Sequence, residues 1–115
     1  KIFVVEYNSC YGPNDAITIK YQENFDIYKS HESCLYYGVS IMAWKKLFRE
    51  FGYEFITVDS NGVNAFFVNK NDFQTTFIEN CKGLSFKENY YQLKKFKTGW
   101  QNQFKIIEQE SFEIL

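Results

Sequence analysis

Residues 52–69 read GYEFITVDSNGVNAFFVN, and this stretch predicts the centre of the fold. Two apolar runs flank Asn61 and Gly62, a pair that accepts the positive φ angles of a two-residue type I′ turn, so the stretch predicts a β-hairpin. The register set by that turn opposes Val58 to Ala65 and Ile56 to Phe67. Both faces of the ribbon are apolar, which predicts an internal position in a layered α/β domain with cover on both sides.

The composition predicts one folded domain that spans residues 1–115. An apolar share of 45% is enough to close one core, and an aromatic share of 21% with a single Pro argues against global disorder. The net charge of −1 gives no overall attraction to nucleic acid or to acidic lipid. No apolar run approaches the roughly 20 residues of a membrane span. Three widely spaced cysteines do not suggest a disulfide framework, so we expect a reducing, cytoplasmic setting.

A strand and a helix precede the hairpin and form a βαβ unit with its first strand. Residues 2–5 read IFVV, a run typical of a parallel strand that is buried on both faces. Residues 39–51 predict a helix that ends at Gly52, because four large apolar residues recur at helical spacing. These four are Trp44, Leu47, Phe48 and Phe51. The two strands of such a unit run parallel with a right-handed connection, and residues 63–69 then return antiparallel.

The segments on either side of this unit are harder to interpret. Residues 9–37 form a long connection, in which residues 17–21 alternate as a short strand does, and a connection of this length is usually a lid or binding loop. After the hairpin, Asn71 and Gln74 match a capping box that predicts a second helix. The apolar residues Phe73, Phe77 and Cys81 are expected to form the buried face of that helix.

The C-terminal tail is both aromatic and basic. Between residues 84 and 105 there are five Lys and one acidic residue, Glu88, among several aromatic rings, and 5 − 1 gives a local charge of +4. One interpretation is a nucleic-acid surface on which the rings stack with bases. The other, which we favour, is that the lysine stems and the rings pack the tail onto the domain. Residues 111–115 are expected to add a short strand.

One spacing is compatible with a metal site. His31 and Cys34 form an HxxC pair that could supply half of a zinc site, with Cys10 as a distant third ligand. Such a pair also arises by chance, and a loop His with small apolar cysteines accounts for it. We therefore expect no metal in this chain.

Four segments of the chain carry a family resemblance. They are VVEYN at residues 4–8, GP at 12–13, YYGVS at 36–40 and GYEFITVDSNGVNAFFV at 52–68. Together they resemble the C-terminal half of FkbM-type and related class I S-adenosylmethionine-dependent methyltransferases. The resemblance covers about residues 2–70 and is most specific in the hairpin, whereas residues 71–115 match only loosely.

This resemblance implies a fold and an activity. The implied fold is a partial Rossmann-like sheet in the strand order five, seven, six, with residues 63–69 as the central antiparallel strand. The implied parent is an O-methyltransferase that acts on a sugar or another hydroxyl. The family holds S-adenosylmethionine mainly with a Gly-rich loop and an acidic residue that follow its first two strands, and this chain contains neither. Because the chain also begins with Lys1, we expect a fragment that binds no cofactor and is inactive alone.

Candidate site residues follow from the geometry of open α/β sheets, in which ligands bind beyond the carboxyl ends of the parallel strands. Either Glu6 or Asp59 could accept the proton of a substrate hydroxyl. The candidate substrate-binding residues are Asn8, Asn61 and Asn64, together with His31 from the long connection. For Asp59 and Asn61, hydrogen bonding to the backbone of the turn is an equally good explanation.

A second hypothesis is an interaction module without enzymatic activity. If the chain is half of a larger sheet, residues 2–5 form an unpaired edge with apolar side chains on both faces. We expect either that the chain forms a homodimer through this edge or that residues 104–115 fold back to cover it. The partner in the first hypothesis is a small-molecule acceptor, and neither hypothesis involves a membrane.

Overall fold

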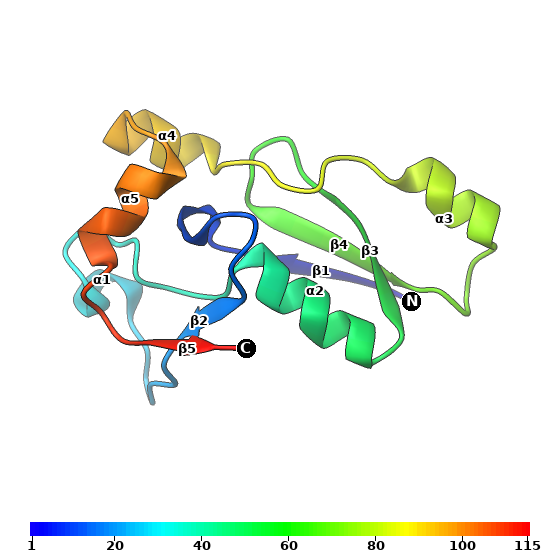
Figure 1. Ribbon diagram of the computed structural model, residues 1–115, viewed down its shortest axis with the longest axis horizontal. Coiled ribbons are helices and arrows are strands. Elements are labelled where there is room, and N and C mark those ends of the chain that lie inside the picture. The colour runs from blue at the N-terminus through cyan, green and yellow to red at the C-terminus, as the bar shows by residue number, and fades with distance from the viewer.

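A three-stranded sheet and the helix that crosses it form the larger part of this α/β fold (Figure 1). The computed structural model describes all 115 residues. The sheet contains β1 (Ile2–Glu6), β3 (Tyr53–Val58) and β4 (Asn64–Asn69) in the order β1-β4-β3. Because β4 pairs antiparallel with both neighbours, β1 and β3 run parallel to each other on its two sides, as predicted for these three strands.

The turn between β3 and β4 differs from the predicted type I′ turn. Gly62 has a positive φ of 69°, whereas Asn61 does not. The Gly62 N–H donates to the Asp59 carbonyl at 3.2 Å, so the turn is centred on Ser60 and Asn61. The Asp59 side chain accepts a hydrogen bond from the Val63 N–H at 2.9 Å, and this bond favours the turn that begins at Asp59.

The register of the hairpin also changes along its length. Val58 lies opposite Ala65, which agrees with the predicted register. Further from the turn, Phe55 lies opposite Phe67 in place of Ile56, so that part of the prediction is wrong. The cause is a β-bulge at Ile56, which adds one unpaired residue to β3 and shifts the following pairs.

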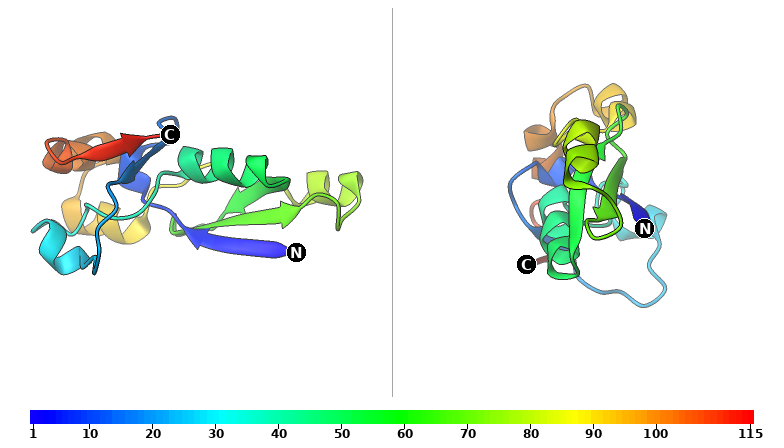
Figure 2. Two further views of the ribbon diagram at one scale, coloured as in Figure 1. Left: turned by 90° about the horizontal axis from the view of Figure 1, so that it is seen from below. Right: turned by 90° about the vertical axis from the view of Figure 1, so that its right-hand side faces the viewer.

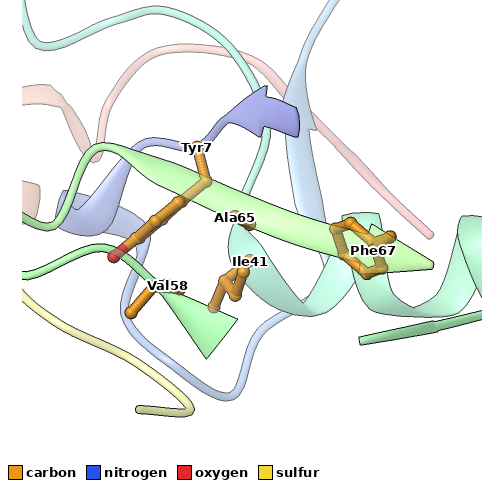
Figure 3. Close-up of a cluster of buried hydrophobic side chains, with 5 residues drawn as sticks. All are labelled: Tyr7, Ile41, Val58, Ala65 and Phe67. Atoms are coloured by element: carbon orange, nitrogen blue, oxygen red, sulfur yellow. The ribbon is translucent and has the colours of Figure 1, made fainter. Parts of the chain in front are cut away.

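One face of the sheet is covered by α2 (Ile41–Glu50), which lies along it (Figure 2). The Ser40 hydroxyl accepts a hydrogen bond from the Ala43 N–H at 3.1 Å and so caps the helix. The Phe48 ring stacks on Phe67 with ring centroids 4.2 Å apart. The central cluster between helix and sheet consists of Tyr7, Ile41, Val58, Ala65 and Phe67 (Figure 3). The predicted helix is thus confirmed, but Leu47 and Phe51 at the edge of its apolar stripe are exposed.

The other face of the sheet is covered only in part, by α3 (Thr75–Cys81). Ile78 is the one residue of this helix that is buried, and Phe73, which precedes the helix, packs partly buried beside it. Phe77 and Cys81 were expected in the core but are exposed, so that part of the prediction is wrong.

The capping box predicted for this helix is also wrong. The Asn71 N–H donates to the Asn69 side-chain oxygen at 2.9 Å, which places Asn71 in a turn that precedes the helix. The helix itself starts after Gln74, and the Gln74 side chain makes no capping hydrogen bond. Asn71 therefore lies too far from the first helical turn to cap it.

The two outer edges of the sheet differ. The edge of β3 is covered by the chain that follows α3, since the Gly83 N–H donates to the Ile56 carbonyl at 3.1 Å and the Val58 N–H donates to the Leu84 carbonyl at 2.9 Å. The edge of β1 has no neighbouring strand. The prediction of burial on both faces of β1 is therefore wrong, and three of its apolar side chains are exposed: Ile2 by 61%, Phe3 by 47% and Val4 by 52%.

The remaining elements pack together beyond the carboxyl end of β1 (Figure 1). β2 (Ile17–Ile19) pairs antiparallel with β5 (Phe112–Ile114), which confirms the two short strands predicted there. Because β5 pairs with β2, the tail does not cover the edge of β1, and that alternative is wrong. The helical elements of this part are η1 (Ser9–Tyr11), α1 (Ile27–Ser30), α4 (Tyr90–Phe96) and α5 (Trp100–Ile107).

A second apolar cluster joins the long connection to the tail. It consists of Cys10, Tyr11, Leu35, Tyr36 and Ile107. Aromatic rings of the tail surround it, with the centroid of the Phe112 ring 5.6 Å from that of Tyr11 and 5.4 Å from that of Tyr36. Within residues 84–105, Phe86, Phe96 and Phe104 pack onto the domain, as the favoured interpretation requires, whereas Tyr90 and Tyr91 are exposed. None of the helices combines the length and the apolar character of a membrane span.

Candidate functional site

Glu6 lies at the carboxyl end of β1, where its side chain borders two cavities. The larger cavity, of about 660 Å³, is bounded by β2 and by the chain that follows it. The smaller, of about 350 Å³, is bounded by α4 and by the end of the long connection. Tyr37 lines both cavities as well. We call the two cavities together the β1-end cleft.

Tyr37 is held in place at both its backbone and its side chain. Its carbonyl accepts hydrogen bonds from the Asn8 side chain at 3.0 Å and from the Tyr11 hydroxyl at 2.7 Å. Its hydroxyl accepts a hydrogen bond from Gln92 Nε2 at 2.8 Å. Burial raises the pKa of Tyr37 to about 12, and the negative charge of Glu6 acts in the same direction. The hydroxyl is therefore protonated at neutral pH, and its hydrogen is available to a ligand oxygen.

Glu6 differs from Tyr37 because its carboxylate has no partner within the protein. The Glu6 backbone carbonyl accepts a hydrogen bond from the Trp44 indole N–H at 2.8 Å, which fixes the end of β1 against α2. The carboxylate itself takes part in none of the ion pairs of the structure. The cleft thus contains one strong acceptor, the Glu6 carboxylate, and one donor, the Tyr37 hydroxyl.

The tail supplies the far wall of the smaller cavity. Asn89 caps α4, since its side-chain oxygen accepts hydrogen bonds from the N–H groups of Tyr91 at 2.8 Å and Gln92 at 3.1 Å. Tyr91, Lys95 and Phe96 line the same wall. A few fixed polar groups among aromatic rings are typical of pockets that bind small molecules. A part of the chain that lies outside the main resemblance thus completes the cleft.

Asp59 and Asn64, two of the predicted site residues, belong to the hairpin turn. The Asp59 carboxylate accepts hydrogen bonds from the Val63 N–H at 2.9 Å and from the Asn64 side chain at 3.0 Å. Burial acts to raise the pKa of Asp59, but the hydrogen bonds outweigh it and hold that pKa below its usual value. Asn61 is exposed at the tip, and its carbonyl accepts from the Tyr90 N–H at 2.8 Å. None of these three predicted residues lines the β1-end cleft.

Asn8 and His31 also take structural positions. Asn8 is fully buried, and its side chain bonds to the carbonyls of Leu35 at 2.7 Å and Tyr37 at 3.0 Å. It therefore positions Tyr37 rather than facing the cleft. His31 Nδ1 accepts from the Ser33 N–H at 3.1 Å, and the ring does not line the cleft. No three His, Cys, Asp or Glu side chains gather in a group that could hold a metal ion.

The sequence interpretation missed Tyr37 and Gln92, which hydrogen-bond to each other in the cleft. Tyr37 lies in the segment YYGVS, directly before Gly38. Its position at the end of the long connection is the sequence feature that could have identified it as a site residue. Gln92 gives no such signal, because it meets Tyr37 across 55 residues of chain.

In comparisons with known proteins, no family model matches the chain, and neither a curated protein nor a solved structure was found to match it.

Proposed function

We propose that this chain is the acceptor-binding, C-terminal portion of a larger methyltransferase-like protein. This parent protein would methylate a hydroxyl of a sugar or a similar compound. The observation that carries the proposal is the unpaired carboxylate of Glu6 at the carboxyl end of β1, in the two cavities that Tyr37 also lines. Two features support it. The order β1-β4-β3 corresponds to the order five, seven, six that the resemblance implies, and ligands of open α/β sheets bind at this end of the strands.

The residues of the cleft suit the binding of the acceptor and the activation of its hydroxyl. Glu6 can accept the proton of the attacking hydroxyl, while Tyr37 donates a hydrogen bond to a neighbouring oxygen of the acceptor. Gln92 orients Tyr37 through its bond at 2.8 Å. Asp59 is less suited to proton transfer, because hydrogen bonds already occupy its carboxylate and lower its pKa.

The residues present do not fit a cofactor site. The sequence contains neither a Gly-rich loop that follows a strand nor the acidic residue that would bind the ribose of S-adenosylmethionine. We therefore assign only acceptor binding and proton transfer to this chain, and we expect the chain alone to be inactive.

Acceptor binding can be measured on the 115-residue chain by NMR titration with methyl α-glucoside and methyl α-mannoside. We expect saturable shifts at the amides of Tyr37 and Gln92. Glu6→Gln removes a charged hydrogen-bond acceptor and should weaken binding about tenfold. Glu108→Gln, an exposed acid at the end of α5, is the matched control and should leave the affinity unchanged. Shifts that are absent from the cleft, or equal losses in the two variants, would contradict the proposal.

The exposed edge of β1 favours a second candidate function, an interaction module that forms a homodimer. The Tyr7 N–H donates to the Val63 carbonyl, and the Asn69 N–H donates to the Lys1 carbonyl. The backbone groups of the odd-numbered residues along β1 therefore form hydrogen bonds with β4. By the alternation of antiparallel pairs, the backbone groups of Ile2 and Val4 point away from the sheet. A second copy aligned antiparallel along this edge would pair them.

Val4→Lys tests the homodimer, because it places a charge in the centre of the edge. We expect the wild-type chain to be a dimer by light scattering and the variant to be a monomer with a similar denaturation midpoint. Phe51→Lys, which introduces the same charge at a residue 71% exposed at the end of α2, should remain dimeric. A monomeric wild-type chain would rule out this candidate.

A further inference from the structure

A pocket distinct from the β1-end cleft lies at the outer edge of β3. It has a volume of about 500 Å³ and is bounded by the second half of α2, the first residues of β3 and the chain that follows α3. In Figure 1, β3 lies between α2 and the chain that follows α3. The cations that line the pocket are Lys45, Arg49, Lys70 and Lys82, and Glu54 is the one carboxylate among the lining residues.

The charges of this pocket do not balance. Lys82 is neutralised by Glu54 at 3.6 Å and by Glu79 at 3.0 Å. Lys45, Arg49 and Lys70 take part in none of the ion pairs of the structure. The chain as a whole has a net charge of −1, so this excess of positive charge is local. A concave site with an excess of one sign of charge concentrates ions of the opposite sign.

Lys45 is the most firmly held of the unpaired cations. Its Nζ donates to the Ser85 carbonyl at 3.1 Å and lies 4.2 Å from the centroid of the Phe55 ring. An ammonium group has three donors, so two remain for a ligand. Burial lowers the pKa of Lys45, which means that the ammonium group has lost hydration that no carboxylate replaces.

Arg49 lies one helical turn after Lys45 on α2, so the two side chains leave the same face of the helix. An Arg guanidinium binds two oxygens of a phosphate at once, and a Lys ammonium adds a point charge beside it. The volume falls within the range of roughly 300 to 1,000 Å³ that is typical of small-molecule pockets. These unpaired cations gather around a single pocket, whereas a nucleic acid would need a longer basic stripe.

We propose that this pocket binds the phosphate group of a small molecule, with Lys45 and Arg49 as the principal contacts. The phosphate is either free or carried as an ester. The proposal does not depend on the function assigned to the β1-end cleft.

Phosphate binding in this pocket can be tested by calorimetry at constant ionic strength with three probes: inorganic phosphate, glucose 6-phosphate and glucose. We expect saturable binding of a phosphate-bearing probe that depends on Lys45 and Arg49, whereas binding of glucose, for which the β1-end cleft would account, should not depend on them. Tighter binding of glucose 6-phosphate identifies an ester as the ligand, and equal or tighter binding of inorganic phosphate identifies free phosphate. Lys45→Met and Arg49→Gln should each weaken binding about tenfold or more.

Lys105→Gln is the control for the change in net charge, since Lys105 is exposed on α5 and does not line the pocket. It should leave the affinity unchanged. Arg49→Gln alters an exposed side chain without an ion pair, so the fold should be retained and circular dichroism can verify this. Absence of saturable binding of both phosphate probes, or an equal loss in the Lys105 variant, would overturn the proposal.

Discussion

Gly62→Ala is expected to lower the free energy of unfolding by about 4 kcal/mol or more, a large part of the stability of a domain of this size. Gly62 has a φ of 69°, a region that costs other residues of order 1 to 3 kcal/mol. The added Cβ would also collide with the backbone carbonyl of Glu88 and lie 2.6 Å from the carbonyl oxygen of Lys87. Both are backbone groups, so relief requires the tail to move away from the hairpin.

That movement would break contacts that join the two parts of the fold. The Tyr7 hydroxyl donates to the Lys87 carbonyl at 2.6 Å, and the Tyr90 N–H donates to the Asn61 carbonyl at 2.8 Å. Both bonds hold the tail where it crosses the turn. We therefore expect the alanine substitution to loosen α4 as well as the hairpin.

Urea denaturation followed by circular dichroism measures the effect, and Gly52→Ala is the matched control. Gly52 has a φ of 80°, but a Cβ there would meet nothing within 4 Å. The control should therefore lose only the conformational term, about 1 to 2 kcal/mol. Equal midpoints for the two variants would show that the tail does not pack on the turn as described.

The parts of the fold that could be predicted from the sequence are those set by local patterns. The helical spacing of Trp44 and Phe48 identified α2, and Gly62 identified the hairpin. The bulge at Ile56 could not be predicted, because neither neighbouring side chain signals an extra residue. The individual contacts of the tail could not be predicted either. They join residues far apart in the sequence, such as Tyr36 and Phe112.

The candidate site was also predicted only in part, since Glu6 borders the cleft whereas Asp59 and Asn8 do not. The rule that ligands bind beyond the carboxyl ends of parallel strands selected both Glu6 and Asp59. Only the structure separates them, because Asp59 bonds to its own turn whereas Glu6 borders an open cleft. Asn8 was selected for its position after β1, yet its burial makes it a support for Tyr37.

Under the proposed function, Glu6→Gln is expected to abolish most of the methyl transfer while leaving the fold intact. The amide has nearly the shape of the carboxylate but cannot accept the proton of the attacking hydroxyl, and a positioned general base contributes about 10² to 10⁴ in rate. Because the Glu6 side chain is exposed and in no ion pair, its replacement should have little effect on stability. Asp59→Asn is the contrasting variant, which should weaken the turn without lowering the rate per folded molecule.

The most direct test is the transfer of a labelled methyl group from S-adenosylmethionine to methyl glycosides by the protein expressed from the complete gene that encodes this chain. We predict transfer by the wild type, a fall of about 100-fold or more in kcat for Glu6→Gln, and an unchanged kcat for Asp59→Asn. Transfer that is undiminished in the Glu6 variant, or no transfer by the wild type to any hydroxylated acceptor, would contradict the proposed function.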